Sequence, residues 1–420
     1  MSIKTLTEQI LEKIPSIGKV QYKFIVRLFD LWLRIQGRHN FTNLSRYSNY
    51  HEQTYRNQFE NDFQFIQFNS CLAKEYLSEN RILTFDPFHL SKSGKCTKGV
   101  GYYYSGCAGG LKWGLEFSGI GVVDLSKKVA LHLGALQTLN KDSKKDSKKD
   151  SKENSKENSK ENQLTYYANH LIKHKKILQE VSQIVVADAY FSKSTFVEAL
   201  KTKGYELITR LRKDAHIRYL YKGERTGKPG RPKQFDGQIN PFEIRMDYFT
   251  LIQTAADNSW KAYEATVNVK AWKQNVKLVV IHHFDEQGKI KRYQLFVSTD
   301  LTMDGQFIKK AYNYRFQSEF VFRDGKQFSG LNHCQARSKE KLNFHINTAL
   351  TVVSLAKICH LIQSKKENSK NKPFSMANFK TSYTNGFIFN RIISMFGFNP
   401  NSKKINFIRE KIKAIGKIAA

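Results

Sequence analysis

Apolar residues recur every three or four positions through the first part of the chain, which is the spacing of one buried face of an α-helix. The pattern is carried by Ile10, Ile14, Ile17, Phe24, Leu28, Leu31 and Ile35. Residues 41–59 predict two short helices separated by a turn, and the second carries polar side chains that can reach base edges or phosphates, Arg56 among them. We therefore expect a helical domain over residues 1–78, either a DNA-binding unit of the helix-turn-helix kind or a plain helical bundle.

From Arg81 onwards the pattern changes to short apolar runs with the length and composition of β-strands. Two of these runs follow each other across a short turn and suit adjacent antiparallel strands, whereas the later ones alternate with helices. Five strands surrounded by helices predict an α/β sheet. The predicted strands cover residues 82–87, 115–125, 129–139, 184–189 and 205–211, and the predicted helices between them cover residues 164–181 and 194–203.

The second half of the chain returns to strands and then to helices. Strands are predicted at residues 249–256, 263–269, 276–283 and 293–298, and helices at residues 304–321 and 342–362. Lys, Asp, Ser, Glu and Asn repeats without an apolar residue fill residues 141–162, so we expect a disordered surface loop there.

These patterns divide the chain into parts. The expected order is a helical DNA-binding domain at 1–78, the first part of a catalytic core at 79–211, a β-rich insertion at 212–300, the second part of the core at 301–363, and a basic C-terminal segment at 364–420.

The net charge of the chain indicates which class of partner it is suited to bind. Lys and Arg number 69 against 37 Asp and Glu among 420 residues, which leaves a formal charge of +32. Such a field favours polyanions, nucleic acid first and an anionic membrane surface second. No apolar run approaches the roughly 20 residues of a membrane span, and no signal peptide is expected. The five cysteines are widely spaced without a Cys-x-x-Cys pair, which argues against a zinc site or disulfide framework and fits a reducing cytoplasm.

Three carboxylates stand where chemistry is expected. Asp86 and Asp188 each close an apolar strand, and Glu319 lies on a helix after the β-rich stretch. Carboxylates at strand ends face an open rim, where Mg²⁺ or Mn²⁺ can be held with some water ligands retained. Two such ions can stabilise the entering and leaving oxygens of an in-line phosphoryl transfer. Taken singly, each acid also suits a solvated loop.

A longer motif surrounds the third carboxylate. Tyr312, Arg315, Glu319 and Lys326 fit the pattern Y-x-x-R-x-x-x-E-x-x-x-x-x-x-K. The spacings of three and four residues place the first three side chains on one helical face, where two suit phosphate oxygens and one suits a metal. The alternative is an amphipathic helix with a surface ion pair.

With these motifs the chain resembles the DDE transposases of bacterial insertion sequences, in the subgroup with this Y-R-E-K signature. The phrases at residues 105–109 and 112–115 are also similar to that family. The resemblance covers about residues 80–362. It implies an RNase H-like mixed sheet with helices, interrupted by a β-strand insertion between the second Asp and the Glu. The repeat at 141–162 and both termini depart from the family pattern.

The resemblance also implies roles for residues. Asp86, Asp188 and Glu319 match the metal-binding catalytic triad, and Tyr312, Arg315 and Lys326 match positions that contact phosphates near the transposon end. An aromatic residue of the insertion is implied to stack on a flipped base. Trp272, flanked by lysines, is preferred over Trp260 for this role, with core packing as the alternative for either.

Smaller signals leave alternatives open. Arg231 lies in a Gly-Arg-Pro sequence, the core of a minor-groove AT-hook, although a basic loop is the simpler interpretation. His89 and His132 either flank the metal site or pack within strands. Asn343, His345 and Asn347 either line DNA or cap a polar face.

The function predicted from the sequence is DNA transposition by metal-dependent cleavage and strand transfer. The expected partners are double-stranded DNA, the terminal inverted repeats of the transposon and target DNA, without a membrane. A homodimer is expected in the synaptic complex, within the bacterial cytoplasm at the nucleoid. The alternatives are an RNase H-like nuclease without strand transfer and a non-catalytic DNA-binding protein derived from a transposase.

Overall fold

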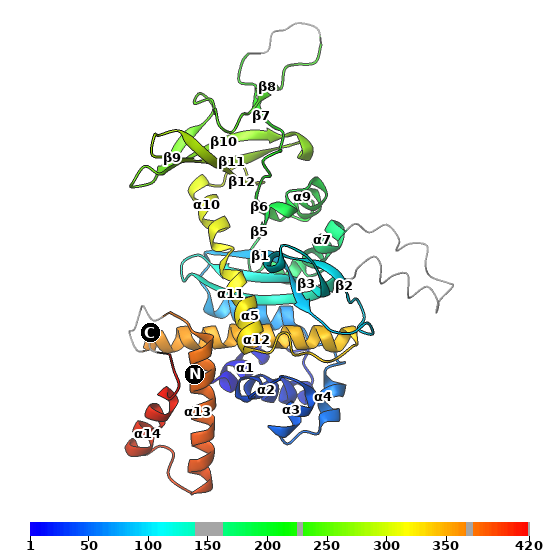
Figure 1. Ribbon diagram of the computed structural model, residues 1–420, viewed down its shortest axis with the longest axis vertical. Helices are drawn as coiled ribbons and strands as arrows, with labels where there is room; N and C mark the ends of the chain where they lie inside the picture. The colour runs from blue at the N-terminus through cyan, green and yellow to red at the C-terminus, as the bar shows by residue number, and fades with distance from the viewer. Residues whose placement is uncertain (139–162, 225–229, 367–372, 419–420) are drawn as a thin grey trace, which may run out of the picture.

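A computed structural model describes residues 1–138, 163–224, 230–366 and 373–418. Helices gather at one end of the molecule, the outermost strands lie at the other, and a mixed sheet lies between them (Figure 1). The repeat at 141–162 lies outside the described residues. The N-terminal helices are α1 (Ile3–Leu11), α2 (Lys19–Arg34), α3 (Phe41–Arg46), α4 (Glu52–Gln58) and α5 (Phe65–Tyr76).

The core strands confirm the predicted mixed α/β fold. Strand β3 pairs antiparallel with β1, and β1 pairs parallel with β5, which pairs parallel with β6. Strand β4 pairs with β3, so the order is β4-β3-β1-β5-β6. One strand, β2, was not predicted because its tyrosines alternate between buried and exposed positions in a stretch without an aliphatic run. The bounds are β1 (Arg81–Ser91), β2 (Gly101–Ser105), β3 (Gly110–Asp124), β4 (Val129–Thr138), β5 (Ile184–Ala187) and β6 (Glu206–Arg210).

The strands of the range 212–300 extend the core sheet without interruption. Strand β12 pairs antiparallel with β6, with Phe296 opposite Arg210, and the strands of the described residues form one 12-stranded sheet. A separate apolar cluster, built around Val267, Leu278 and Leu295, supports this outer part. Strands β7 and β8, four residues each, were too short for the sequence pattern to predict. The bounds are β7 (Ile217–Leu220), β8 (Phe235–Gln238), β9 (Thr250–Thr254), β10 (Trp260–Val269), β11 (Gln274–Phe284) and β12 (Ile290–Ser298).

Helices cover the sheet and differ from prediction at two breaks. The helix predicted at 164–181 is divided at His174, whose ψ of 18° is not helical, and the helix predicted at 304–321 is divided at Arg315 and Phe316. The helices are α7 (Gln163–Lys173), α8 (Lys175–Gln179), α9 (Ser194–Lys201), α10 (Gly305–Tyr314), α11 (Gln317–Phe328), α12 (Lys339–Lys366), α13 (Met376–Met395) and α14 (Lys403–Ala414), with short 3-10 turns η1 (Gly106–Ala108), η3 (Ala189–Phe191) and η4 (Lys270–Trp272).

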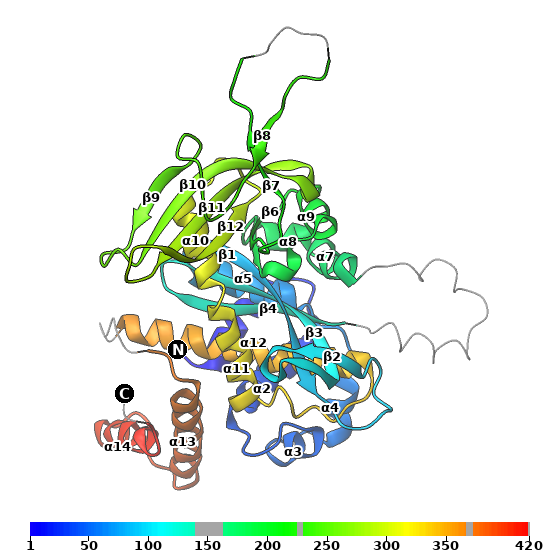
Figure 2. The same cartoon turned by 45° about the horizontal axis from the view of Figure 1, so that its top comes forward.

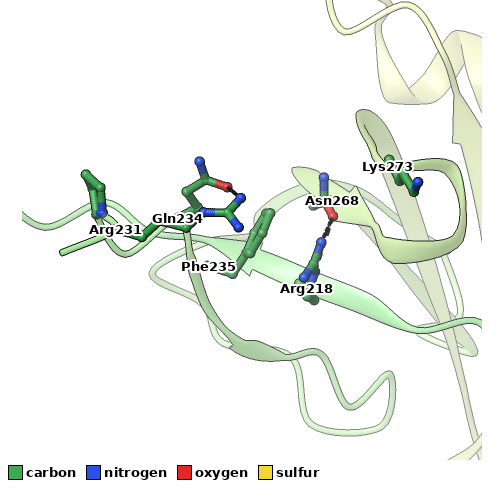
Figure 3. Close-up of a pocket in the computed structure, with 7 residues that line it drawn as sticks. Arg218, Arg231, Gln234, Phe235, Asn268 and Lys273 are labelled. Atoms are coloured by element: carbon green, nitrogen blue, oxygen red, sulfur yellow. Dashed lines mark hydrogen bonds between the residues drawn. The ribbon is translucent and has the colours of Figure 1, made fainter.

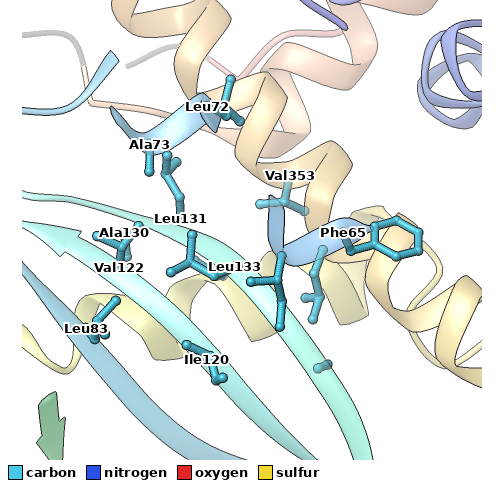
Figure 4. Close-up of a cluster of buried hydrophobic side chains, with 14 of the residues drawn as sticks. Phe65, Leu72, Ala73, Leu83, Ile120, Val122, Ala130, Leu131, Leu133 and Val353 are labelled. Carbon is cyan, nitrogen blue, oxygen red and sulfur yellow. The ribbon is translucent and has the colours of Figure 1, made fainter. Parts of the chain in front are cut away.

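The long helix α12 crosses the face of β4 beside α5 (Figures 1 and 2). Apolar side chains from both helices meet those of β1, β3 and β4 there, as Figure 4 shows for Leu72, Val353 and Leu131. The segment Lys339–Lys365 is long and apolar enough to cross a membrane, but 83% of its most apolar window is buried inside the protein. That degree of burial is typical of a core helix.

Polar side chains of α12 bind the β4 backbone. The Asn347 amide accepts a hydrogen bond from Ala135 N at 2.8 Å and donates one to Ala135 O at 3.0 Å. Asn343 Oδ1 accepts from Gln137 N at 3.3 Å. Buried backbone groups need hydrogen-bond partners, and these two asparagines supply them to β4. Of the two interpretations left open by the sequence, contact with DNA and capping of a polar face, the structure supports capping.

The C-terminal helix α13 packs on α2 and α12. The Tyr383 hydroxyl donates to the Asp30 carboxylate, and Lys380 Nζ donates to Phe328 O at 2.9 Å. The C-terminal segment is thereby joined to the N-terminal helices and to the end of α11.

Candidate active site between β1, β5 and α11

The pairing of β1 with β5 brings two of the three predicted carboxylates together. Phe85 lies opposite Ala187 in the parallel register, and each is followed directly by an aspartate, Asp86 and Asp188. Adjacent strands lie about 4.8 Å apart, so the two carboxylates leave neighbouring strands at the same level. Strand β5 ends at Ala187, so among the described residues no strand pairs with Pro87 on that side, which suits a residue without a backbone N–H.

Two glycines and one hydrogen bond set the position of α11 against the sheet. A Cβ atom on Gly119 would lie 2.8 Å from Phe322 Cζ, and one on Gly121 would lie 2.8 Å from Thr84 Oγ1. Their absence lets α11 approach β3 and β1 closely. The Thr84 and Ser318 hydroxyls then form a buried hydrogen bond of 2.7 Å. Glu319 follows Ser318, so this contact fixes the third carboxylate beside the middle of β1, where Asp86 lies.

Arg315 joins two of the carboxylates. Its Nη1 donates to Asp86 Oδ2 at 3.1 Å and its Nη2 to Glu319 Oε1 at 3.4 Å. Among the described residues, no acceptor lies within bonding distance of the buried Arg315 Nε. The Asp188 carboxylate accepts from Tyr190 N at 2.8 Å, and Asp188 O accepts from the Thr209 hydroxyl at 2.7 Å.

The site contains too little positive charge to neutralise its three carboxylates. Burial raises the pKa of Asp86 to about 7, the Arg315 guanidinium opposes that shift, and the charges of Asp188 and Glu319 add to it. Three ionised carboxylates beside one guanidinium carry a net charge of about −2, which one divalent cation offsets.

The donor chemistry of these three residues fits a divalent metal. Mg²⁺ and Mn²⁺ take carboxylate oxygens and keep water ligands at an open site. The side chains of Asp86 and Glu319 are 22% and 41% exposed, so water has access. Within the described ranges, no group of three Asp, Glu, His or Cys side chains is already arranged to hold an ion, because Arg315 lies between two of the acids.

The structure places Tyr312 beside this cluster and Lys326 further along α11. The Tyr312 ring lies 4.7 Å from that of Phe296, and burial raises the pKa of its phenol. The charges of Arg315, Asp188 and Asp86 also act on that phenol. Lys326 lies in the last turn of α11, where its charge helps to lower the pKa of His89, although burial is the main cause.

The two histidines proposed as neighbours of the metal differ in their surroundings. His89 lies on β1 three positions beyond Asp86 and is half-buried. His132 is fully buried on β4, where its Nε2 lies 3.0 Å from Asn347 Oδ1, and burial lowers its pKa to about 4. His132 therefore packs inside the protein, and His345 does likewise, with Nε2 2.8 Å from Gly330 O.

Two further candidates, Arg56 and Arg231, lie outside this cluster. Arg56 on α4 pairs with Glu52 and lies over the Phe41 ring at 5.1 Å. Arg231, exposed in the loop before β8, donates to Gln234 Oε1 at 3.4 Å. Residues 228–229 of its basic sequence lie outside the described residues.

Trp272 is packed rather than open. Its indole Nε1 donates to Ser192 O at 2.9 Å, and its ring contacts both apolar clusters. Trp260 lies at the start of β10 with Lys309 Nζ 3.2 Å from its ring centre. The contacts of Trp272 support the packing alternative, and base stacking by either residue stays a prediction.

Sequence reasoning missed Thr84, Ser318 and Gly119. None of them carries a charge or belongs to a motif, and Thr84 and Ser318 are 234 positions apart. Only the glycines of the run Ser118-Gly-Ile-Gly121 gave a signal, since alternate glycines on one face of a strand indicate close approach of another element.

Comparison with known proteins gives one family match. Residues 37–276 match the DDE superfamily endonuclease family, a range that covers more than half of the chain and includes Asp86 and Asp188. No curated protein matches the chain. Among solved structures, the cryo-EM structure of a piggyBac transposase synaptic complex with hairpin DNA aligns with 100% of this chain and 82% of that one, at 12% identity and a TM-score of 0.36. The assignment rests on the family match, which confirms the predicted enzyme class: the chain belongs to the DDE superfamily of endonucleases.

Proposed function

We propose that this DDE endonuclease is a DNA transposase of the insertion-sequence subgroup that carries the Y-R-E-K signature. The observation that carries the proposal is the convergence of Asp86, Asp188 and Glu319, from three distant segments, around Arg315. A DNA-binding protein without catalysis has no need of three carboxylates that repel phosphates. A formal charge of +32 supports DNA as the partner.

The three carboxylates would hold the metal, and a pair of divalent ions, Mg²⁺ or Mn²⁺, would supply positive charge to the oxygens of the reacting phosphate. Arg315 orients Asp86 and Glu319 through its two Nη groups and keeps Nε for a further acceptor. Guanidinium groups bind phosphates through several N–H groups, but a phosphate oxygen would reach this buried Nε only after the Arg315 side chain moves. Tyr312 packs beside Arg315 and limits its movement.

The reaction that we propose has two steps, cleavage at the ends of the element and attack of the freed 3′-hydroxyl on target DNA. Both steps are in-line phosphoryl transfers, so one set of carboxylates serves both. The substrates are the terminal inverted repeats and a target duplex. Two ends must be held together, which favours a homodimer in the synaptic complex, in the bacterial cytoplasm.

Asp188→Asn tests the proposal with little change in structure. The asparagine Oδ1 can still accept the bond from Tyr190 N. We expect cleavage of end DNA with Mg²⁺ to fall by about 100- to 1,000-fold, on the scale of a lost catalytic group, while end binding holds or rises because a negative charge is gone. Asp257→Asn is the matched control, since Asp257 also caps a turn through Ser259 N but lies in an exposed loop.

The outcomes distinguish the proposal from its rivals. Wild-type cleavage by Asp188→Asn would show that the carboxylate assignment is wrong. Cleavage by the wild-type enzyme without any joined product, with pre-cut ends and target DNA supplied, would identify a nuclease that lacks strand transfer. DNA binding without cleavage under any metal would identify a protein that only binds.

A further inference from the structure

The outer end of the sheet contains a basic cavity away from the carboxylates. Its volume is about 550 Å³, and it lies between β7, β8 and the turn that joins β10 to β11 (Figure 3). Arg218, Arg231 and Lys273 line it together with Phe235, Gln234 and Asn268. Within the described part of the chain none of the three cations forms an ion pair, and no carboxylate lines the cavity.

Arg218 is held in place by neutral partners. Its Nη2 and Nε donate to Asn268 Oδ1 at 2.6 and 3.2 Å, and Asn268 Nδ2 in turn donates to Asn275 Oδ1 at 3.0 Å. The guanidinium lies 3.6 Å from the centre of the Phe235 ring. These contacts fix the orientation of the guanidinium and leave its charge without a counterion, which is the arrangement of a preorganised anion site.

We propose that this cavity binds a phosphodiester group of the DNA that the active site cuts. This inference rests on the proposed function. Arginine and lysine without acidic neighbours are the usual donors to phosphate oxygens, and a neutral network positions them without cancelling their charge. Arg231, predicted as a DNA contact from its Gly-Arg-Pro sequence, joins the site, whereas Arg218 and Phe235 gave no signal in the sequence.

The sheet fixes how far this contact lies from the reaction. Five strand spacings separate β5 from β7, or about 24 Å, and Asn268 lies four residues below the level of Asp188, or about 13 Å. The separation is therefore roughly 27 Å. At about 3.4 Å per base pair, a duplex that follows the sheet would touch the cavity about eight base pairs from the cut.

The test measures DNA binding by the full chain against salt concentration. A duplex with the cut site and about 15 base pairs on each side is the probe. Each lost phosphate contact lowers the steepness of the slope of log K against log salt by about 0.9, so we expect Arg218→Gln with Lys273→Gln, which together remove the one contact at this cavity, to lower it by about 0.9. Arg292→Gln, an exposed position at the far end of β12, is the control and should leave the slope near that of the wild type.

Footprinting and inorganic phosphate separate the sources of the anion. The double variant should lose protection at phosphates about eight base pairs from the cut and keep it at the cut itself. Phosphate that binds the wild-type cavity while the DNA slope of the double variant stays unchanged would show a site for free anions and overturn the proposal. Lys273→Gln alone, which breaks no bond within the network, guards against a folding defect in Arg218→Gln.

The results can reject the cavity as a DNA site and the proposed function separately. A changed slope in a protein that never cleaves DNA would retain the cavity as a DNA site and reject the transposase. A slope equal to that of Arg292→Gln, in a protein that cleaves normally, would reject the cavity and retain the transposase.

Discussion

At the scale of single residues, the geometry of the active site depends on a glycine without a side chain as much as on the charged side chains. Gly119 has no side chain, and that absence leaves room for the ring of Phe322 in the middle of α11. Phe322 in turn stacks on Phe88, with ring centres 4.4 Å apart, so it has little freedom to move aside. The position of Glu319 on α11 therefore depends on Gly119 of β3, which carries a hydrogen atom where other residues carry a side chain.

Gly119→Ala should impair catalysis more than binding. The new methyl would lie 2.8 Å from Phe322 Cζ and 3.2 Å from Asp86 O, so α11 must shift. Overpacking of this kind costs about 1–3 kcal/mol, and we expect cleavage to fall by more than tenfold while affinity for end DNA changes little. Single-turnover cleavage at saturating DNA measures the effect.

Two further variants make that experiment decisive. Gly110→Ala lies on the same strand with nothing within 4 Å of the added atom, and it should cleave as the wild type does. Phe322→Leu in the Gly119→Ala background should recover part of the activity. Equal cleavage by both alanine variants would show that the close approach does not position Glu319.

At the scale of elements, the sequence predicted those features that depend on the local pattern of apolar and polar residues. Asp86 and Asp188 were found because each was expected to close an apolar strand. Asp188 does follow the end of β5, whereas β1 continues past Asp86 to Ser91, and the parallel pairing places the two side by side. The helix break at Phe316 was not predicted, because Arg315 and Phe316 both keep helical backbone angles and the spacing from Tyr312 to Glu319 survives it.

Contacts between segments far apart in the sequence could not be predicted from local pattern. The bond from Thr84 to Ser318 and the asparagines of α12 follow only from how helices dock on the sheet. Their polar side chains look like surface residues in the sequence, whereas in the structure they are the partners that buried groups require.

Asn347→Leu tests that role of α12. Leucine is similar in size but leaves Ala135 N, Ala135 O and His132 Nε2 without their partner. Each buried polar group left unpaired costs about 1–3 kcal/mol, so we expect the free energy of unfolding in urea to fall by at least about 3 kcal/mol. Lys365→Gln, exposed on the same helix, should change it by less than about 0.5 kcal/mol. Similar stability of both variants would mean that water replaces the asparagine.

At the scale of the whole molecule, a strongly basic surface encloses several neutral imidazoles. Burial lowers the pKa of His132 and of His345 to about 4 and that of His170 to about 3, and it lowers the pKa of His39 well below its usual value. These residues come from the connection between α2 and α3, the core sheet and the helices that cover it. Protonation of any of them works against the fold as a whole.

Stability should therefore fall as the pH falls from about 6.5 to about 4. The unfolded chain binds protons at its histidines near pH 6.5, but the folded protein binds them only near pH 4, so the unfolded state gains in that window. Each fully buried histidine contributes up to about 3 kcal/mol of this loss, and the raised pKa of the single Asp86 carboxyl offsets part of the summed loss over the same range. Urea unfolding at pH 7 and at pH 5 measures it.

The contribution of one histidine can be isolated. His132→Gln should reduce the difference between pH 7 and pH 5, whereas His51→Gln, on the exposed start of α4, should leave it unchanged. An identical pH dependence in the two variants would contradict the assignment of the acid sensitivity to buried imidazoles.

The continuity of the sheet has a mechanical consequence. Strand β6 is hydrogen-bonded to β5 on one side and to β12 on the other, so the outer strands are attached to the catalytic edge by backbone bonds rather than by a tether. A stiff protein of this kind cannot fold around a straight duplex, and the strain of a close fit falls on the nucleic acid. Base steps that kink readily, such as TA and CA, lower that strain, so the enzyme should favour ends that are pliable between the cut and the outer sheet, at positions where no side chain reads the bases.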